Sequence, residues 1–175
     1  MRAALFLDRD GVLNENRPGH VRSWEEYRFL PGVKDALARA ARTEFAIVVV
    51  TNQSVIGRGF ATRNTVEDIH RRMTAEIAAS GGRVDAVYLC PHAPEDGCDC
   101  RKPRPGMLLA AAREMGLDLA RSWMVGDAAT DVAVAQAAGV RPVLVLSGRA
   151  GPWDAAPGVP VAADLGAALN AFILR

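Results

Sequence analysis

Acidic and hydroxyl side chains stand where three apolar runs of this sequence end. The run ALFLD closes on Asp8, AIVVVT closes on Thr51, and SWMVGD closes on Asp127. Asp10 follows in a D-x-D-G turn, and three carboxylates gathered together would repel one another without a cation. Carboxylate oxygens beside a phosphate suit Mg²⁺, and Lys102 would add a fixed positive charge. This set predicts phosphoryl transfer through an aspartyl-phosphate, in which positioning and charge neutralisation supply most of the catalysis.

A second group of residues lies within positions 90–100. It consists of Cys90, His92, Cys98 and Cys100, in the spacing C-x-H-x5-C-x-C. These sulfur and nitrogen atoms match the ligands of a closed tetrahedral Zn²⁺ site, which leaves no position for catalysis. Because the intervening letters PHAPEDG have no apolar periodicity, a metal would be required to close the loop. Buried cysteines or a disulfide are the alternatives.

The elements that must position both groups alternate between two kinds of pattern. Short apolar runs predict strands at 4–8, 46–51, 84–90, 122–127 and 141–147. Helical spacing predicts helices at 33–42, 65–80, 106–115, 130–139 and 164–174. This alternation predicts an α/β fold, a Rossmann-like three-layer sandwich with a mostly parallel sheet. Since the carboxyl ends of parallel strands face one crevice, residues far apart in sequence would meet there.

Composition bounds the size, partners and compartment. A chain of 175 residues fits one domain, 1–175, and its 50 % apolar and 23 % charged residues are typical of a globular protein. The net charge of +1 favours a small-molecule partner, with no nucleic acid and no membrane. The opening apolar run breaks at Asp8, too early for a signal peptide or a membrane span. The early break of this run and the odd number of cysteines together indicate a cytoplasmic protein. We also expect a monomer.

The chain resembles the haloacid-dehalogenase superfamily of phosphatases, whose four motifs occur here in order. They read LFLDRDGVLN, VVVTNQS, the lysine of RKPRPGM, and MVGDAATD, within residues 4–147. The resemblance implies that Asp8 is the nucleophile, Asp10 the general acid and base, Thr51 a donor to the phosphoryl oxygens, and Lys102 their charge stabiliser. It also implies that Mg²⁺ is held by Asp8, the backbone carbonyl of Asp10, and Asp127.

Protonation states follow from these roles. Asp10 must give a proton to the leaving oxygen and later take one from water, so it needs a protonated fraction near neutral pH. Asp8 must stay ionised. Asp131 is open: it would orient the lysine or the metal shell, or else serve as a helix N-terminal charge.

The stretch CPHAPEDGCDCRKPRPGM resembles the zinc loop of a narrower branch, the histidinol-phosphate and heptose-bisphosphate phosphatases. The gaps between motifs are filled by single helices, which predicts that no cap domain is inserted. The heptose-bisphosphate members are the more similar, because VVVTNQSVIGRGF and FLPGV match theirs. A histidinol-phosphate phosphatase, with Glu15 facing the substrate amine, is the alternative. A zinc-organised module without activity is a remote one.

Contacts to a phosphorylated sugar are expected from two loops and from basic residues. Arginines at 58 and 101 would grip the phosphate that is not hydrolysed, with bidentate geometry. The predicted substrate-binding residues are Asn16, Gly19, His20, Asn52, Gln53, Ser54, Arg58 and Arg101. His70, on a predicted helix, is interpreted as an ordinary surface histidine.

Overall fold

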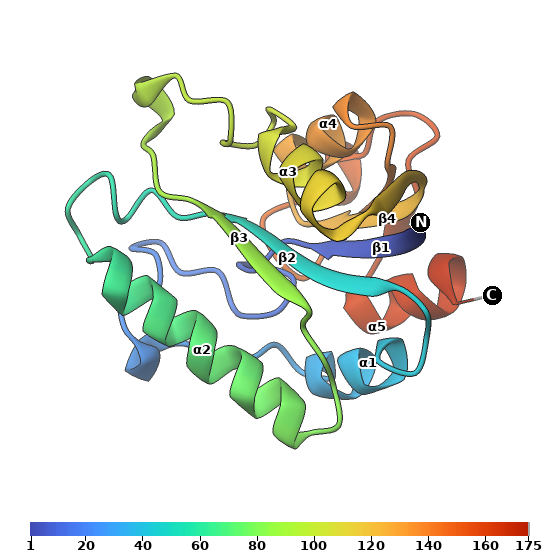
Figure 1. Ribbon diagram of the computed structural model, residues 1–175, viewed down its shortest axis with the longest axis horizontal. Helices are drawn as coiled ribbons and strands as arrows, with labels where there is room; N and C mark the ends of the chain where they lie inside the picture. The colour runs from blue at the N-terminus through green and yellow to red at the C-terminus, as the bar shows by residue number, and fades with distance from the viewer. Residues whose placement is uncertain (175) are drawn as a thin grey trace.

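The computed structural model describes residues 1–174 and contains one six-stranded parallel sheet (Figure 1). Its strand order is β3-β2-β1-β4-β5-β6, the Rossmann order. The strands are β1 Arg2–Leu7, β2 Ala46–Asn52, β3 Ala86–Cys90, β4 Leu117–Gly126, β5 Arg141–Val145 and β6 Val161–Ala162. Their central runs are almost continuously apolar, as in sheets buried on both faces.

Helices cover both faces of the sheet, which gives the three layers seen in Figure 1. One layer holds α1 Val33–Ala40, α2 Arg63–Ala79 and α5 Leu165–Ala168, which runs on as a π-helix over Leu169–Ile173. The other layer holds α3 Gly106–Met115 and α4 Ala129–Ala137. Short 3₁₀ helices occupy Trp24–Glu26, Pro94–Asp96 and Pro152–Asp154.

The alternation of side chains along each strand builds two separate cores. In β1, Leu5 and Leu7 pack toward α1, α2 and α5, whereas Ala4 and Phe6 pack toward α3 and α4. All four are fully buried. The sheet is therefore fixed on both sides, and the residues that follow its strands start from a rigid edge.

The predicted fold class and element order are confirmed, and one boundary is shifted by more than two residues. β4 begins at Leu117, before the predicted start at 122, because the polar letters DLARS hide its first half. The register with β1 shifts between Ala3 and Leu5. There the Ser122 hydroxyl accepts a hydrogen bond from the Ala4 N–H at 2.8 Å.

No helix in residues 1–174 is long and apolar enough to cross a bilayer.

The chain leaves neighbouring strands toward opposite faces. After β1 it continues to α1 on one face, and after β4 it continues to α4 on the other. Such a divergence opens a crevice at the carboxyl ends of the two strands, where ligands bind in open α/β sheets. Asp8 and Asp127 follow these strands directly.

Candidate active site and zinc site

Asp8 and Lys102 form an ion pair at the end of β1. The Lys102 ammonium lies 2.9 Å from Asp8 Oδ1 and 2.7 Å from Asp131 Oδ1, and it donates to the Val50 carbonyl at 3.0 Å. Lys102 is only 3 % exposed. Burial alone would lower the pKa of Lys102, but the carboxylates of Asp131 and Asp8 outweigh it and raise the pKa. The ammonium is therefore a permanent charge aimed at Asp8.

Asp131 anchors this lysine. Its Oδ1 accepts from Lys102 and its Oδ2 accepts from the Ala128 N–H at 3.1 Å. Carboxylate oxygens of Asp8, Asp127 and Asp131 lie within 4.8 Å of one another, so they could hold a cation. Because both oxygens of Asp131 already accept hydrogen bonds, Asp8 and Asp127 are the freer ligands.

The pKa values of Asp8 and Asp127 are both raised. Burial raises the pKa of Asp8 to about 7, with Lys102 opposing this rise and Asp131 and Asp10 adding to it. Burial and the Asp8 carboxylate also raise the pKa of Asp127. Asp127 Oδ2 accepts from Asn16 Nδ2 at 2.6 Å and from the Arg149 N–H at 2.8 Å. A divalent cation between these carboxylates would relieve their repulsion.

Asp10 occupies the opposite environment. Its Oδ1 accepts from Asn14 at 2.9 Å, its Oδ2 accepts from Gln53 at 2.9 Å, and Arg9 donates to both oxygens at 2.9 and 3.1 Å. Burial would raise the pKa of Asp10, but the Arg9 charge and these hydrogen bonds lower it. The sequence led us to expect an ionised Asp8 and a partly protonated Asp10. In the protein alone the order is reversed, because the pKa of Asp8 is raised and that of Asp10 is lowered.

Residues at the end of β2 and just after it support the site from behind. Asn52 clamps the lysine backbone: its Nδ2 donates to the Lys102 carbonyl at 3.2 Å and its Oδ1 accepts from the Lys102 N–H at 3.1 Å. Thr51 is 1 % exposed, and its hydroxyl accepts from Gln53 Nε2 at 2.9 Å. Gln53 therefore bridges Thr51 and Asp10.

A cavity of about 330 Å³ opens over these groups. Nine predicted site residues line it: Asp8, Asp10, Asn16, His20, Asn52, Ser54, Arg101, Lys102 and Asp127. Thr51, Gln53, Gly19 and Arg58 lie outside its wall. The wall also contains Arg149 and Thr130, which the sequence analysis did not single out. The signal for Arg149 was its place just after the apolar run of β5, at the same edge of the sheet.

Basic side chains lie in the wall of this cavity and close to it. His20 adopts a left-handed backbone conformation with φ 61° and forms part of the cavity wall. Burial lowers the pKa of His20, and the charges of Arg149, Arg58 and Arg22 lower it further against the pull of Asp10. Arg58 is therefore near His20, although it does not line the cavity.

The four zinc-type residues converge as their spacing predicts. Sulfur atoms of Cys90, Cys98 and Cys100 lie 3.2 to 3.6 Å apart, and His92 Nδ1 lies 3.3 Å from Cys100 and 3.6 Å from Cys90. A tetrahedral ion with Zn–S bonds of about 2.3 Å would space sulfurs about 3.8 Å apart. The cysteines are free thiols. Burial raises the pKa of Cys90 to about 12, so a bound cation would be needed to hold its thiolate.

The loop that carries this cluster also carries the lysine. Arg101 donates to the His92 carbonyl at 3.2 Å, and Arg104 donates to the Cys98 carbonyl at 2.7 Å. Gly57 donates to the Pro91 carbonyl at 2.8 Å, and a Cβ on Gly57 would come within 2.8 Å of that same oxygen. Glycine is required here by this close approach.

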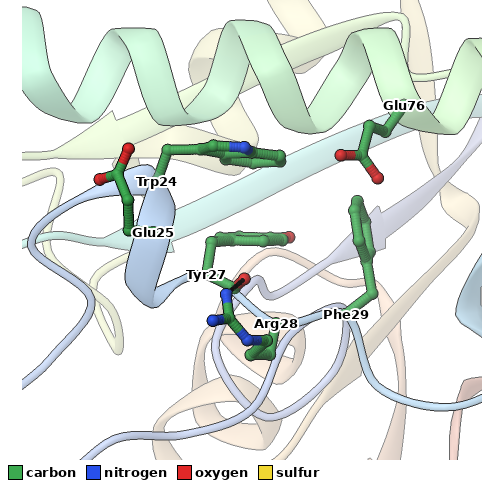
Figure 2. Close-up of a pocket in the computed structure, with 6 residues that line it drawn as sticks. All are labelled: Trp24, Glu25, Tyr27, Arg28, Phe29 and Glu76. Carbon is green, nitrogen blue, oxygen red and sulfur yellow. Dashed lines mark hydrogen bonds between the residues drawn. The ribbon is translucent and has the colours of Figure 1, made fainter.

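A second cavity, of about 450 Å³, lies beside α2 (Figure 2). Its wall consists of Trp24, Glu25, Tyr27, Arg28, Phe29 and Glu76. The Lys34 ammonium lies 4.6 Å from the Phe29 ring centroid and pairs with Glu76 at 2.5 Å. The Phe29 ring and the Glu76 carboxylate of this wall are therefore already in contact with a positive charge from the protein. None of the predicted site residues in the described part of the chain lines it.

The sheet order, the two aspartates after β1, and a buried lysine anchored by an acidic residue after β4 define a phosphohydrolase of the haloacid-dehalogenase type. Residues 99–168 match the "HAD-hydrolase-like" family model. The D-glycero-beta-D-manno-heptose-1,7-bisphosphate 7-phosphatase of Pseudomonas putida is 43 % identical over 156 residues, which are 89 % of each chain. The enzyme of the same name from Escherichia coli is 42 % identical over 83 % of this chain and 80 % of its own.

Solved structures agree with these relatives. The D,D-heptose 1,7-bisphosphate phosphatase of B. bronchiseptica, crystallised with magnesium and phosphate, is 40 % identical with a TM-score of 0.91 over 96 % of both chains. The enzyme of Burkholderia thailandensis is 34 % identical with a TM-score of 0.74, over 99 % of this chain and 100 % of that one. The chain belongs to the heptose-bisphosphate phosphatase family of haloacid-dehalogenase-like hydrolases.

Proposed function

We propose that this protein is a Mg²⁺-dependent phosphatase that hydrolyses the 7-phosphate of D-glycero-β-D-manno-heptose 1,7-bisphosphate. The observation that carries the proposal is the Asp8 carboxylate, 2.9 Å from a buried ammonium, in the wall of a cavity that Arg101 and Arg149 also line. The names of the relatives support the substrate and its β anomer.

The four predicted catalytic residues receive these roles in the reaction. Asp8 attacks phosphorus, the bond to the sugar oxygen breaks, and Asp10 gives that oxygen a proton. Asp10 then takes a proton from the water that attacks the aspartyl-phosphate, which releases phosphate and restores Asp8. Lys102 neutralises the phosphoryl oxygens, and Thr51 donates to them. Asn16, Asn52 and Ser54 line the cavity and would support the sugar and the phosphate. Gln53, which was expected to contact the substrate, is buried outside the wall and instead holds Asp10 and Thr51.

The donor set fits Mg²⁺, because hard carboxylate oxygens of Asp8 and Asp127 converge and the Asp8 charge raises the pKa of Asp127. These residues, with the Asp10 carbonyl, would hold the ion, which supplies charge neutralisation for the phosphate. The ion would also lower the pKa of Asp8, and the negative phosphate would raise that of Asp10. The two groups would then reach the protonation states that their roles require.

The cluster of Cys90, His92, Cys98 and Cys100 would hold a structural Zn²⁺, since four soft ligands leave no open position. Free thiols suit a reducing compartment, which supports the cytoplasm as the location. We keep one domain and a monomer as predictions.

Steady-state kinetics on both heptose-bisphosphate anomers and on histidinol phosphate test the substrate. We expect the highest kcat/KM for the β anomer. Glu15, the residue that would have bound the histidinol amine, is exposed and lies outside the cavity wall. A kcat/KM that favours histidinol phosphate would overturn the heptose proposal and leave the phosphatase class intact.

The distal phosphate gives a second prediction. Arg101 and Arg149 line the cavity, and the charges of Arg149 and Arg58 lower the pKa of His20 in its wall. These guanidinium groups would therefore bind the C1 phosphate. Arg149→Ala should raise KM for the bisphosphate about tenfold, the equivalent of one charged hydrogen bond. KM for heptose 7-phosphate should stay unchanged. Arg141→Ala, at the other end of β5, is the control; an equal rise for both substrates would contradict the assignment.

A further inference from the structure

Arg9, between the two aspartates of the D-x-D-G turn, is fully buried, although arginine is rarely so. Its guanidinium donates to both carboxylate oxygens of Asp10 through NH2, at 2.9 and 3.1 Å. Its NH1 lies 3.1 Å from Nε2 of His70 on α2. Within residues 1–174 its Nε has no hydrogen-bond partner, so Asp10 and His70 hold the group.

His70 is 5 % exposed, which corrects its interpretation as a surface histidine. Burial and the neighbouring Arg9 charge lower the pKa of His70 to about 3. The imidazole is therefore neutral, and its Nε2 can accept a hydrogen bond from the Arg9 guanidinium. An acceptor is what a buried guanidinium needs, because a buried N–H group without a partner is destabilising.

Tyr27 completes the housing. Its ring centroid lies 5.9 Å from Arg9 Cζ, and Trp24 stacks on it at 5.1 Å with an interplanar angle of 13°. Figure 2 shows the Tyr27 ring beneath Trp24 and beside Phe29. Tyr27 is 4 % exposed, so the aromatic side chains screen the arginine from solvent. The guanidinium can move only if His70 or Asp10 releases it.

We propose that His70 is a positioning residue for the phosphatase reaction: it fixes Arg9, and Arg9 fixes the Asp10 carboxyl against the leaving oxygen. This inference rests on the proposed role of Asp10 as general acid. His70 itself touches no reacting atom. Its loss should impair proton delivery to the leaving group and spare phosphoryl transfers that need no proton.

Two substrates separate these cases. A heptose alkoxide must be protonated as it leaves, whereas the nitrophenolate of p-nitrophenyl phosphate leaves without a proton. The ratio kcat/KM covers the steps up to release of the alcohol, so it isolates the general acid from the later attack by water. His70→Leu should lower kcat/KM for the heptose bisphosphate about tenfold or more, as loss of a charged hydrogen bond predicts. For p-nitrophenyl phosphate the change should stay below about twofold.

His70→Gln can place an amide oxygen near the Nε2 position and should restore most of the lost heptose activity. Ile69→Val, buried one position away on α2, disturbs packing without removing an acceptor and should leave the ratio of the two substrates unchanged. Melting temperatures verify that each variant folds; should His70→Leu fail to fold, the Gln variant and His70→Met carry the comparison. An equal loss for both substrates, or no rescue by glutamine, would overturn the proposal.

A failure of the proposed substrate looks different. Wild-type protein would then not hydrolyse the heptose bisphosphate, and any alkyl phosphate that it does hydrolyse takes that substrate's place. The comparison requires only one poor and one good leaving group.

Discussion

Asp8→Asn is expected to abolish turnover, with kcat lower by about 10⁵-fold or more, as removal of a covalent nucleophile lowers it in other hydrolases. An amide cannot form the aspartyl-phosphate, and Lys102, 2.9 Å from Asp8 in the wild type, would have no carboxylate to orient. Steady-state release of phosphate from the heptose bisphosphate measures the loss. Wild-type protein should also yield an acid-stable phosphorylated species on rapid quenching, and the variant should not.

The same variant should remain folded, which separates lost chemistry from lost structure. The folded-state pKa of Asp8 lies above its ordinary value of 3.8, at about 7, so the folded protein binds this proton more tightly than the unfolded chain. The contribution of Asp8 to the free energy of unfolding therefore decreases as the pH rises from 3.8 to about 7. In EDTA at pH 8, Asp8→Asn should melt at or above the wild-type temperature. Turnover that survives in the variant would refute the covalent mechanism.

Cys98→Ala is expected to abolish zinc binding and to lower kcat about 10–100-fold, the usual effect of a small misplacement in a catalytic site. Cys100 and Lys102 are two residues apart, and Arg101 and Arg104 tie this segment to carbonyls of the zinc loop. A Cβ on Gly106 would meet the Asp99 carbonyl at 2.4 Å, so the start of α3 also packs on the loop. An open loop would release the backbone of the lysine from one side, although Asn52, Asp131 and the Val50 carbonyl would still bind it.

Two measurements distinguish this coupling from general damage. The affinity for Mg²⁺ should change little, because Asp8 and Asp127 follow β1 and β4 and do not belong to the loop. Glu95→Ala, exposed in the same loop, is the matched control and should retain one zinc per chain and full kcat. A Cys98→Ala protein without zinc but with wild-type kcat would refute the coupling.

Local patterns were sufficient to predict the frame of the site. A strand period of two residues and alternation with helices specify a parallel sheet, and the polar residues at its strand ends then share one edge. The zinc ligands were likewise evident, because four residues within 90–100 can converge through the loop alone. These features are predictable because they depend only on residues that are close together in the sequence.

The sequence by itself therefore determined the fold class, the strand-end aspartates and the metal-type spacing. Only the tertiary structure decided which residues lie behind them. His70 meets Arg9 across 61 positions because α2 packs against the turn after β1. The apolar spacing of Val66, Ile69 and Met73 marks the buried face of α2 and includes position 70, but only the fold brings Arg9 to that face. Arg149 lines the cavity and Asp131 anchors Lys102 because the fold brings together segments that are distant in the sequence. Contacts between elements depend on how helices and loops pack on the sheet, and that packing is set by the whole chain at once.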